Sequence, residues 1–228
     1  MGYVKSLKNI KAVLFDVDGT LLDIREGYCK GINDALDFYG FNKIDEERIW
    51  KLRRNGINAF KILQSVLGSH KKLPLVEKKR REFRETLKYR NLDKPFKKAK
   101  STLTKLKQNR KMVFITSLRK SESFLLKQLE MFGLDKYVDD VFVIKESPAG
   151  KDHDLMKKKL IEKFIGKHGF KPNECVIVGD AVADIRGGKQ TGIHTVAVTS
   201  GVTGKKLLKN ENPDRIIDKV FEIMKIVK

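Results

Sequence analysis

The sequence predicts an α/β fold, with a Rossmann-like parallel sheet covered by helices on both faces and an inserted α-helical cap domain. Short apolar runs alternate with amphipathic helical patterns, as in parallel sheets that are buried on both faces. The runs lie about 20 to 35 residues apart in the second half of the chain, but about a hundred residues separate the first run from the second. That long interval is mostly helical in pattern, which predicts an insertion after the first strand.

Six apolar runs have the length and composition of buried strands. They cover residues 12–15, 112–115, 141–144, 175–178, 195–198 and, more weakly, 215–217. Two amphipathic helices are expected between the later strands, at 121–132 and 152–167, because apolar residues recur every three or four positions. In the second helix Met156, Leu160 and Phe164 form the apolar stripe, and lysines fill the positions around them.

The long interval contains four helical patterns, at 26–39, 46–55, 59–67 and 74–89. Glycines at 40, 56 and 68 separate the patterns, and Pro95 marks the return to the sheet. We therefore expect a core domain formed by residues 1–21 and 95–228 and a helical cap domain formed by residues 22–94.

The composition favours a folded protein with a substantial core, because 40% of the 228 residues are hydrophobic. No apolar run approaches the length of a membrane span, so no membrane partner is expected. The two cysteines, Cys29 and Cys175, lie far apart and form no C-x-x-C pattern, which is typical of a cytoplasmic protein. Monomer and dimer both stay open.

The formal net charge of +20 is unusual for a chain of this length. Residues 71–100 alone contain 13 Lys or Arg against 4 Asp or Glu. Such charge attracts anionic substrates or nucleic acid, but lysine-rich solvated helix faces are the simpler interpretation. Basic residues occur in every region, and no aromatic residues interleave with them as a base-stacking platform requires. Nucleic acid therefore stays open as a partner without being favoured.

The first strand runs into the sequence D-V-D-G-T at residues 16–20. Residues two apart in an extended chain face the same side, so the two carboxylates can reach one centre. Gly19 permits a tight departure from the strand. Thr116 and Asp180 also end strand-like runs, and ligands of α/β sheets bind beyond the carboxyl ends of the strands. Asp16, Thr116 and Asp180 are therefore expected to meet at one edge of the sheet.

These segments resemble the haloacid dehalogenase superfamily, and in particular its phosphoglycolate phosphatase-like branch with a helical type-1 cap. The resemblance covers nearly the whole chain, because four pieces occur in the order of the family. They are the D-x-D-G-T run, the strand ending in Thr116 and Ser117, Lys151, and the G-D-x-x-x-D run with Asp180 and Asp184. The resemblance implies a Mg²⁺-dependent phosphatase that hydrolyses a small phosphorylated metabolite, phosphoglycolate-like or a sugar phosphate, through an aspartyl-phosphate.

The resemblance also assigns roles to the acidic residues. Asp16 is expected to be the nucleophile and Asp18 the general acid and base, with a neighbouring carboxylate and a bound phosphate raising the pKa of Asp18. Asp16, the backbone carbonyl of Asp18 and Asp180 are expected to hold Mg²⁺, a hard cation that prefers oxygen ligands. Asp184 is expected to contact a metal-bound water or a neighbouring residue.

Phosphate oxygens are expected to meet the hydroxyl of Thr116, the backbone at Ser117 and the ammonium of Lys151. The lysine departs from the family's pattern, because relatives often have K-P-x-P there and this chain has G-K-D-H at 150–153. Lys145 is the alternative for this role.

Two other functions stay open. A phosphomutase of the β-phosphoglucomutase type shares all of these segments and differs in keeping phosphate on the sugar. A basic nucleic-acid-associated protein, with or without phosphatase activity on strand ends, would account for the charge. The sequence does not determine the substrate: Arg53, Arg54 and Asn55 form either a polar loop that closes over the site or a solvated helix end.

Overall fold

The computed structural model describes residues 6–119, 121–144 and 152–227. The predicted α/β fold is confirmed, because six parallel strands form one sheet in the order β5-β4-β1-β6-β7-β8. Each strand lies within two residues of its predicted position at both ends. The strands are β1 (Ala12–Phe15), β4 (Met112–Ser117), β5 (Asp140–Val143), β6 (Cys175–Gly179), β7 (His194–Val198) and β8 (Arg215–Ile217).

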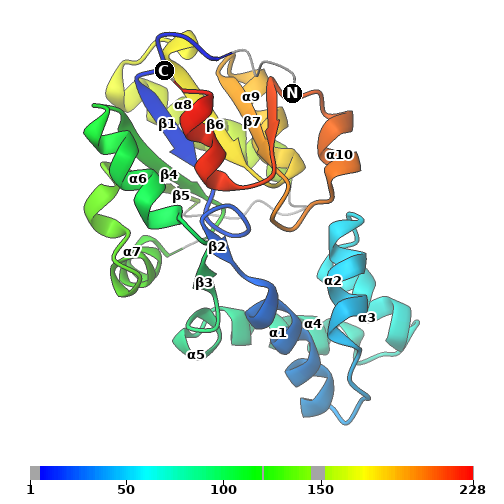
Figure 1. Cartoon of the computed structure of the whole chain (residues 1–228). Coiled ribbons are helices and arrows are strands. Elements are labelled where there is room, and N and C mark those ends of the chain that lie inside the picture. The colour runs from blue at the N-terminus through cyan, green and yellow to red at the C-terminus, as the bar shows by residue number, and fades with distance from the viewer. Residues whose placement is uncertain (1–5, 120, 145–151, 228) are drawn as a thin grey trace.

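The sheet separates two apolar layers, because side chains alternate between its faces along each strand. In β1, Val13 and Phe15 belong to the layer that includes the inner faces of α6 (Ala99–Gln108) and α7 (Glu122–Met131), whereas Leu14 belongs to the layer that includes α8 (His153–His168). Both layers are needed to bury β1 completely, which explains its uninterrupted apolar sequence. Figure 1 shows helices on both faces of the sheet. The core helices are α6 (Ala99–Gln108), α7 (Glu122–Met131), α8 (His153–His168), α9 (Val182–Gln190) and α10 (Lys205–Asn210), with 3₁₀ helices at Asp135–Tyr137, Pro172–Glu174 and Val220–Lys225.

A second group of helices lies beside the carboxyl edge of the sheet (Figure 1), and we call this group the cap and the remainder the core. The pattern at 74–89 does not form one helix, because the chain breaks after Arg84 and a short helix begins at Leu87. The cap helices are α1 (Arg25–Phe38), α2 (Glu46–Arg54), α3 (Ala59–Leu67), α4 (Leu73–Arg84) and α5 (Leu87–Arg90).

The chain enters and leaves the cap through a short antiparallel ribbon. Strand β2 (Leu22–Asp23) pairs with β3 (Lys94–Pro95). This ribbon was not anticipated, although it lies where the domain boundaries at residues 22 and 94 are predicted. The division into two domains with these limits stays a prediction that the ribbon supports.

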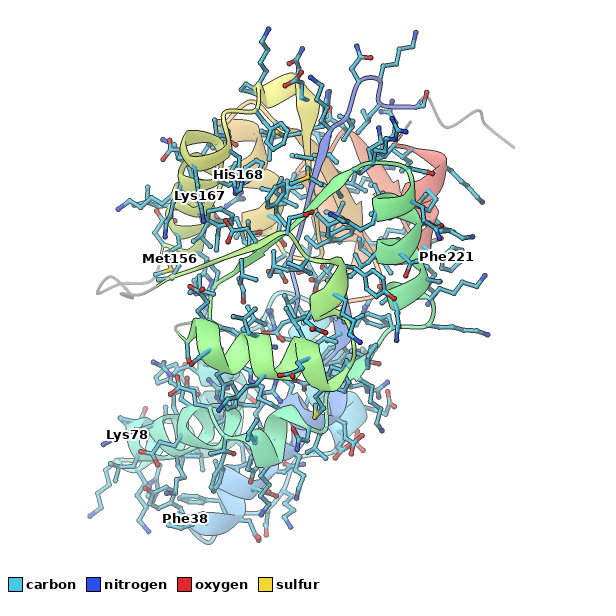
Figure 2. All side chains as sticks on the ribbon, turned by 90° about the vertical axis from the view of Figure 1, so that its left-hand side faces the viewer. Phe38, Lys78, Met156, Lys167, His168 and Phe221 are labelled. Atoms are coloured by element: carbon cyan, nitrogen blue, oxygen red, sulfur yellow. The ribbon has the colours of Figure 1, made fainter. Side chains whose placement is uncertain are left out.

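Basic side chains are spread over both parts of the molecule. Lys78 lies on the cap, whereas Lys167 and His168 lie at the end of α8 in the core (Figure 2). Lys167 is paired, since its Nζ donates to Asp140 at 2.7 Å and His168 contacts the same carboxylate at 3.0 Å. This spread agrees with solvated helix faces. Among the described residues, no helix has both the length and the apolar character that crossing a membrane requires.

Candidate active site

The carboxyl ends of three neighbouring strands bring the predicted acidic residues together. Strand β1 lies between β4 and β6, so Asp16 after β1, Thr116 near the end of β4 and Asp180 after β6 reach one edge. Oxygen atoms of Asp16, Asp180 and Asp184 lie within 4.8 Å of one another. Asp184 reaches the group from the first turn of α9, one helical turn beyond Asp180.

A lysine that the sequence analysis missed lies among these carboxylates. The Nζ of Lys157 is 2.8 Å from Asp16 Oδ1 and 2.8 Å from Asp184 Oδ1, and it donates to the carbonyl oxygen of Thr116 at 2.9 Å. Its side chain is only 1% exposed. Lys157 thus has the contacts expected of the family's lysine, while the predicted Lys151 and its alternative Lys145 lie outside the described residues.

The helical pattern held a signal for Lys157. It lies four residues before Ile161 and seven before Phe164, and both of these side chains are fully buried on the inner face of α8. Positions spaced in this way share one face of a helix. A lysine on the apolar face needs a buried charged partner, whereas its neighbours Lys158 and Lys159 do not lie on that face.

Asp180 is held from two sides and its neighbourhood excludes larger residues. Its Oδ1 accepts a hydrogen bond from the Thr20 hydroxyl at 2.8 Å, and its Oδ2 accepts one from the Val202 N–H at 2.6 Å. A Cβ added at either Gly19 or Gly201 would lie 2.1 Å from Asp180 Oδ2. Gly19 also has a φ of +98°, so the tight turn predicted from the sequence depends on glycine twice over.

The acidic cluster carries more negative than positive charge, with three carboxylates and one lysine. Burial raises the pKa of Asp16 well above its usual value, Lys157 opposes this rise, and Asp184 and Asp180 add to it. Burial and the neighbouring charge of Asp184 raise the pKa of Asp180 to about 7. Three carboxylates therefore share one lysine in a buried space, and their oxygen atoms are the donors that a hard divalent cation prefers. The residues fit a metal ion of this kind.

The phosphate-binding residues predicted on β4 differ in their surroundings. Thr116 is fully buried, and within the described part of the chain its hydroxyl has no hydrogen-bond partner. Buried hydroxyls are nearly always satisfied, so this one is a group that a ligand oxygen could complete. Ser117 is also buried, and its hydroxyl accepts a hydrogen bond from the Arg119 N–H at 3.3 Å.

Asp18 has a surrounding that the sequence analysis did not anticipate. The Nε of Arg119 donates to Asp18 Oδ2 at 2.9 Å and its Nη2 donates to Asp18 Oδ1, while Nη1 of Arg90 lies 3.4 Å from both oxygens. Burial alone would raise the pKa of Asp18, but Arg119 and Arg90 outweigh it and hold the pKa well below its usual range. The structure therefore contradicts the expected rise in the pKa of Asp18, which is lowered instead.

The end of α2 connects the cap to a core loop. The guanidinium of Arg54 donates to the carbonyl oxygens of Gly201 and Thr199, the latter at 3.0 Å, and the N–H of Gly204 donates to the Arg54 carbonyl at 2.8 Å. Asn55 ends the helix. Arg53 instead lies with its guanidinium carbon 5.9 Å from the centre of the Tyr28 ring. Of the three residues of the predicted polar loop, Arg54 thus binds the core.

Comparison with known proteins decides the family. A model of the haloacid dehalogenase-like hydrolase family matches residues 13–198. The chain belongs to this family. The matched residues include Asp16, Asp180 and Asp184. The expected family is confirmed, and so is the expected class of enzyme, a hydrolase.

Relatives within the haloacid dehalogenase-like family match this chain over nearly its full length. It is 27% identical over 227 residues to a phosphoglycolate phosphatase of Vibrio parahaemolyticus, covering 96% of this chain and 97% of that protein. It is 27% identical over 219 residues to the pyrophosphatase PpaX of Bacillus mycoides, covering 96% and 97%. A solved haloacid dehalogenase-like hydrolase from Streptococcus pneumoniae has the same fold, with a TM-score of 0.79, 22% identity and coverage of 95% and 97%.

Proposed function

We propose that this protein is a Mg²⁺-dependent phosphatase that hydrolyses a small phosphorylated metabolite through an aspartyl-phosphate on Asp16. The observation that carries the proposal is the convergence of Asp16, Asp180 and Asp184 around the buried Lys157. Two relatives of different names, a phosphoglycolate phosphatase and a pyrophosphatase, support the same reaction class. In both, water cleaves a bond between phosphorus and oxygen.

Asp16 supplies the nucleophile. One carboxylate oxygen attacks the phosphorus atom, the bond from phosphorus to the leaving oxygen breaks, and the phosphoryl group passes to Asp16. Water then cleaves the resulting mixed anhydride, which restores the carboxylate and releases phosphate. Lys157 holds Asp16 Oδ1 at 2.8 Å, which leaves the other oxygen to attack and offsets the repulsion between two anions.

Asp18 supplies the proton that the leaving oxygen needs, and it later accepts one from the attacking water. Asp18 lies two residues beyond Asp16, and residues two apart in an extended chain face the same side. Because Arg119 and Arg90 hold the pKa of Asp18 well below its usual range, this role requires the Arg119 guanidinium to move away from the carboxylate when substrate binds. The unpartnered Thr116 hydroxyl donates to a phosphoryl oxygen.

The proposed metal ligands are the carboxylates of Asp16 and Asp180 and the backbone carbonyl of Asp18. Asp184 instead contacts Lys157, and its Oδ2 accepts a hydrogen bond from the N–H of Ala181 at 3.0 Å. When bound, Mg²⁺ supplies positive charge that neutralises the phosphoryl oxygens.

The cytoplasmic location stays a prediction from the free, buried cysteines.

The substitution Asp16→Asn tests the proposal directly. It should reduce hydrolysis of p-nitrophenyl phosphate in Mg²⁺ by at least about a thousandfold, because an amide is a poor nucleophile. Asp37→Asn, on the exposed surface of α1, is the matched control and should keep wild-type activity. Circular dichroism checks that both variants fold, and undiminished hydrolysis by Asp16→Asn rules out the nucleophile.

The same assay, extended to a panel of phosphorylated metabolites, separates hydrolysis from phosphoryl transfer. A phosphatase releases inorganic phosphate in proportion to the substrate consumed. A phosphomutase instead converts one sugar phosphate into another and releases little phosphate. Loss of substrate without phosphate release would therefore replace the proposed function with the mutase.

A further inference from the structure

A cluster of five charged side chains, Asp18 among them, lies where the cap meets the core. The two carboxylates are Asp18 and Asp93, and the three guanidinium groups are those of Arg84, Arg90 and Arg119. Arg84, Arg90 and Asp93 come from the end of the cap, whereas Asp18 and Arg119 follow core strands. Each of the three arginine side chains is at most 12% exposed. The charges therefore compensate one another without much help from water.

Two of the arginines each have a carboxylate of their own. Arg84 donates to both oxygens of Asp93, at 3.0 and 3.2 Å. Arg119 donates to both oxygens of Asp18, at 2.9 Å through its Nε and through its Nη2. Paired contacts of this kind are the strongest geometry for a guanidinium and a carboxylate. They use the best acceptor positions of both acids.

Arg90 is the surplus cation of the cluster. Its Nη1 lies 3.4 Å from both oxygens of Asp18 and 3.6 Å from Asp93 Oδ2, longer than the contacts of the other two arginines. Its Nε is buried and has no hydrogen-bond partner in the described part of the chain. Burial lowers the pKa of Arg90 to about 10; Asp18 opposes this, while Arg119 and Arg84 add to it. A buried guanidinium without a dedicated anion costs free energy, and an anionic ligand would offset that cost.

The neighbours of Arg90 hold it next to the leaving-group side of the site. The amide of Gln128, which is almost fully buried on α7, donates to the Arg90 carbonyl at 2.6 Å and accepts a hydrogen bond from Arg119. Arg90 is thus fixed through its backbone, while its guanidinium meets the carboxylate that serves as the general acid. A general acid must contact the leaving oxygen, so the charge of Arg90 flanks the leaving group.

We propose that Arg90 is a specificity residue that binds a negative charge on the leaving group, so that the preferred substrates carry a carboxylate or a second phosphate beyond the transferred phosphoryl group. This inference rests on the proposed phosphatase function. Phosphoglycolate and pyrophosphate, for which the two relatives are named, both have anionic leaving groups. The positive charge of Arg90 would favour an anionic leaving group of either kind, and it does not by itself distinguish a carboxylate from a phosphate.

The test compares substrates that differ only in the charge of the leaving group. The first pair is 2-phosphoglycolate and its neutral amide, phosphoglycolamide, and pyrophosphate is assayed in parallel as the phosphate-bearing substrate. Steady-state kinetics give kcat/KM for each compound with wild type, Arg90→Gln and Arg90→Lys. Lys88→Gln, an exposed charge on the same short helix, is the matched control. Thermal unfolding of each variant reports whether it folds.

In wild type the acid should be preferred over the amide, and Arg90→Gln should lower that kcat/KM ratio by roughly 100-fold, with the loss expressed mainly in KM. Arg90→Lys should restore part of the ratio, and Lys88→Gln should leave it unchanged. The kcat/KM for phosphoglycolate and for pyrophosphate is compared between wild type and Arg90→Gln. The compound whose kcat/KM falls more carries the anion that Arg90 is proposed to bind.

Three results would overturn the inference. If Arg90→Gln slows the acid and the amide equally, Arg90 acts on the phosphoryl group or on Asp18 and not on the leaving group. If Arg90→Gln changes kcat/KM for neither the acid nor the amide, Arg90 binds no substrate charge, although hydrolysis by wild type would leave the phosphatase proposal intact. If wild type hydrolyses none of the compounds and no aryl phosphate either, both the proposed function and the inference fail.

Discussion

Replacing Lys157 with methionine should destabilise the protein by an amount that follows from its contacts. The ammonium lies 2.8 Å from a carboxylate oxygen of both Asp16 and Asp184 and is 1% exposed. Methionine keeps the length of the chain but leaves two buried carboxylates without their cation. Breaking a buried ion pair by removing one partner costs about 3 to 5 kcal/mol.

For a protein of this size each kcal/mol shifts the Tm by about 2 to 4 °C. The Tm of Lys157→Met should therefore fall by roughly 6 to 20 °C. Thermal unfolding followed by circular dichroism in chelator measures it, so that bound metal cannot compensate. Lys159→Met, two residues along α8 and exposed, is the matched control and should stay near wild type.

A second substitution separates charge from packing. Adding Asp184→Asn to Lys157→Met removes one of the stranded negative charges, so the double variant should recover part of the lost Tm. A Tm for Lys157→Met within about 2 °C of wild type would refute the argument. So would a double variant less stable than the single one, because the loss would then come from packing in α8.

Three further results are expected. Burial would raise the pKa of Glu77, but Arg80 and Arg81 hold this pKa below its usual value of 4.5. The stability that ionised Glu77 contributes is therefore present above about pH 4.5. It disappears as the pH falls through the lowered pKa. In urea unfolding, Glu77→Gln should thus lose about 1 to 3 kcal/mol at pH 7 and much less at pH 3; an equal loss at both would exclude the ion pairs as its source. Gly201→Ala places a Cβ 2.1 Å from Asp180 Oδ2 and should cost about 1 to 3 kcal/mol together with most of the phosphatase activity, whereas normal activity would mean that the loop yields freely. Chelation of divalent metal should abolish hydrolysis of p-nitrophenyl phosphate and added Mg²⁺ should restore it; full activity in chelator would contradict the proposed metal site.

The sheet could be predicted from the sequence because its central strands are buried on both faces. A strand such as β1 must then be apolar at every position, which makes it visible as a run. The β2–β3 ribbon could not be seen in this way, since two residues on each side give no periodicity. The break after Arg84 was hidden too, because Glu85 and Thr86, which separate the two helices, include no glycine or proline to mark the end of a helix.

The acidic residues of the candidate site could be predicted because their spacing within one segment and their places after strands are properties of the sequence itself. Lys157 was obscured by the lysines beside it, since within the sequence only its spacing from Ile161 and Phe164 separates it from Lys158 and Lys159. Arg119 had no signal at all. Its partner Asp18 is 101 residues away, and only the pairing of β1 with β4 brings the two together.

The attachment of α2 to the core gives the cap a mechanical route to the catalytic carboxylates. Arg54 grips the carbonyl oxygens of Thr199 and Gly201, and the next N–H in that loop, from Val202, steadies Asp180. A movement of the cap that breaks the Arg54 hydrogen bonds would therefore shift the backbone that positions Asp180. By linkage, a ligand that binds more tightly while Val202 holds Asp180 would also favour the contact of Arg54 with this loop.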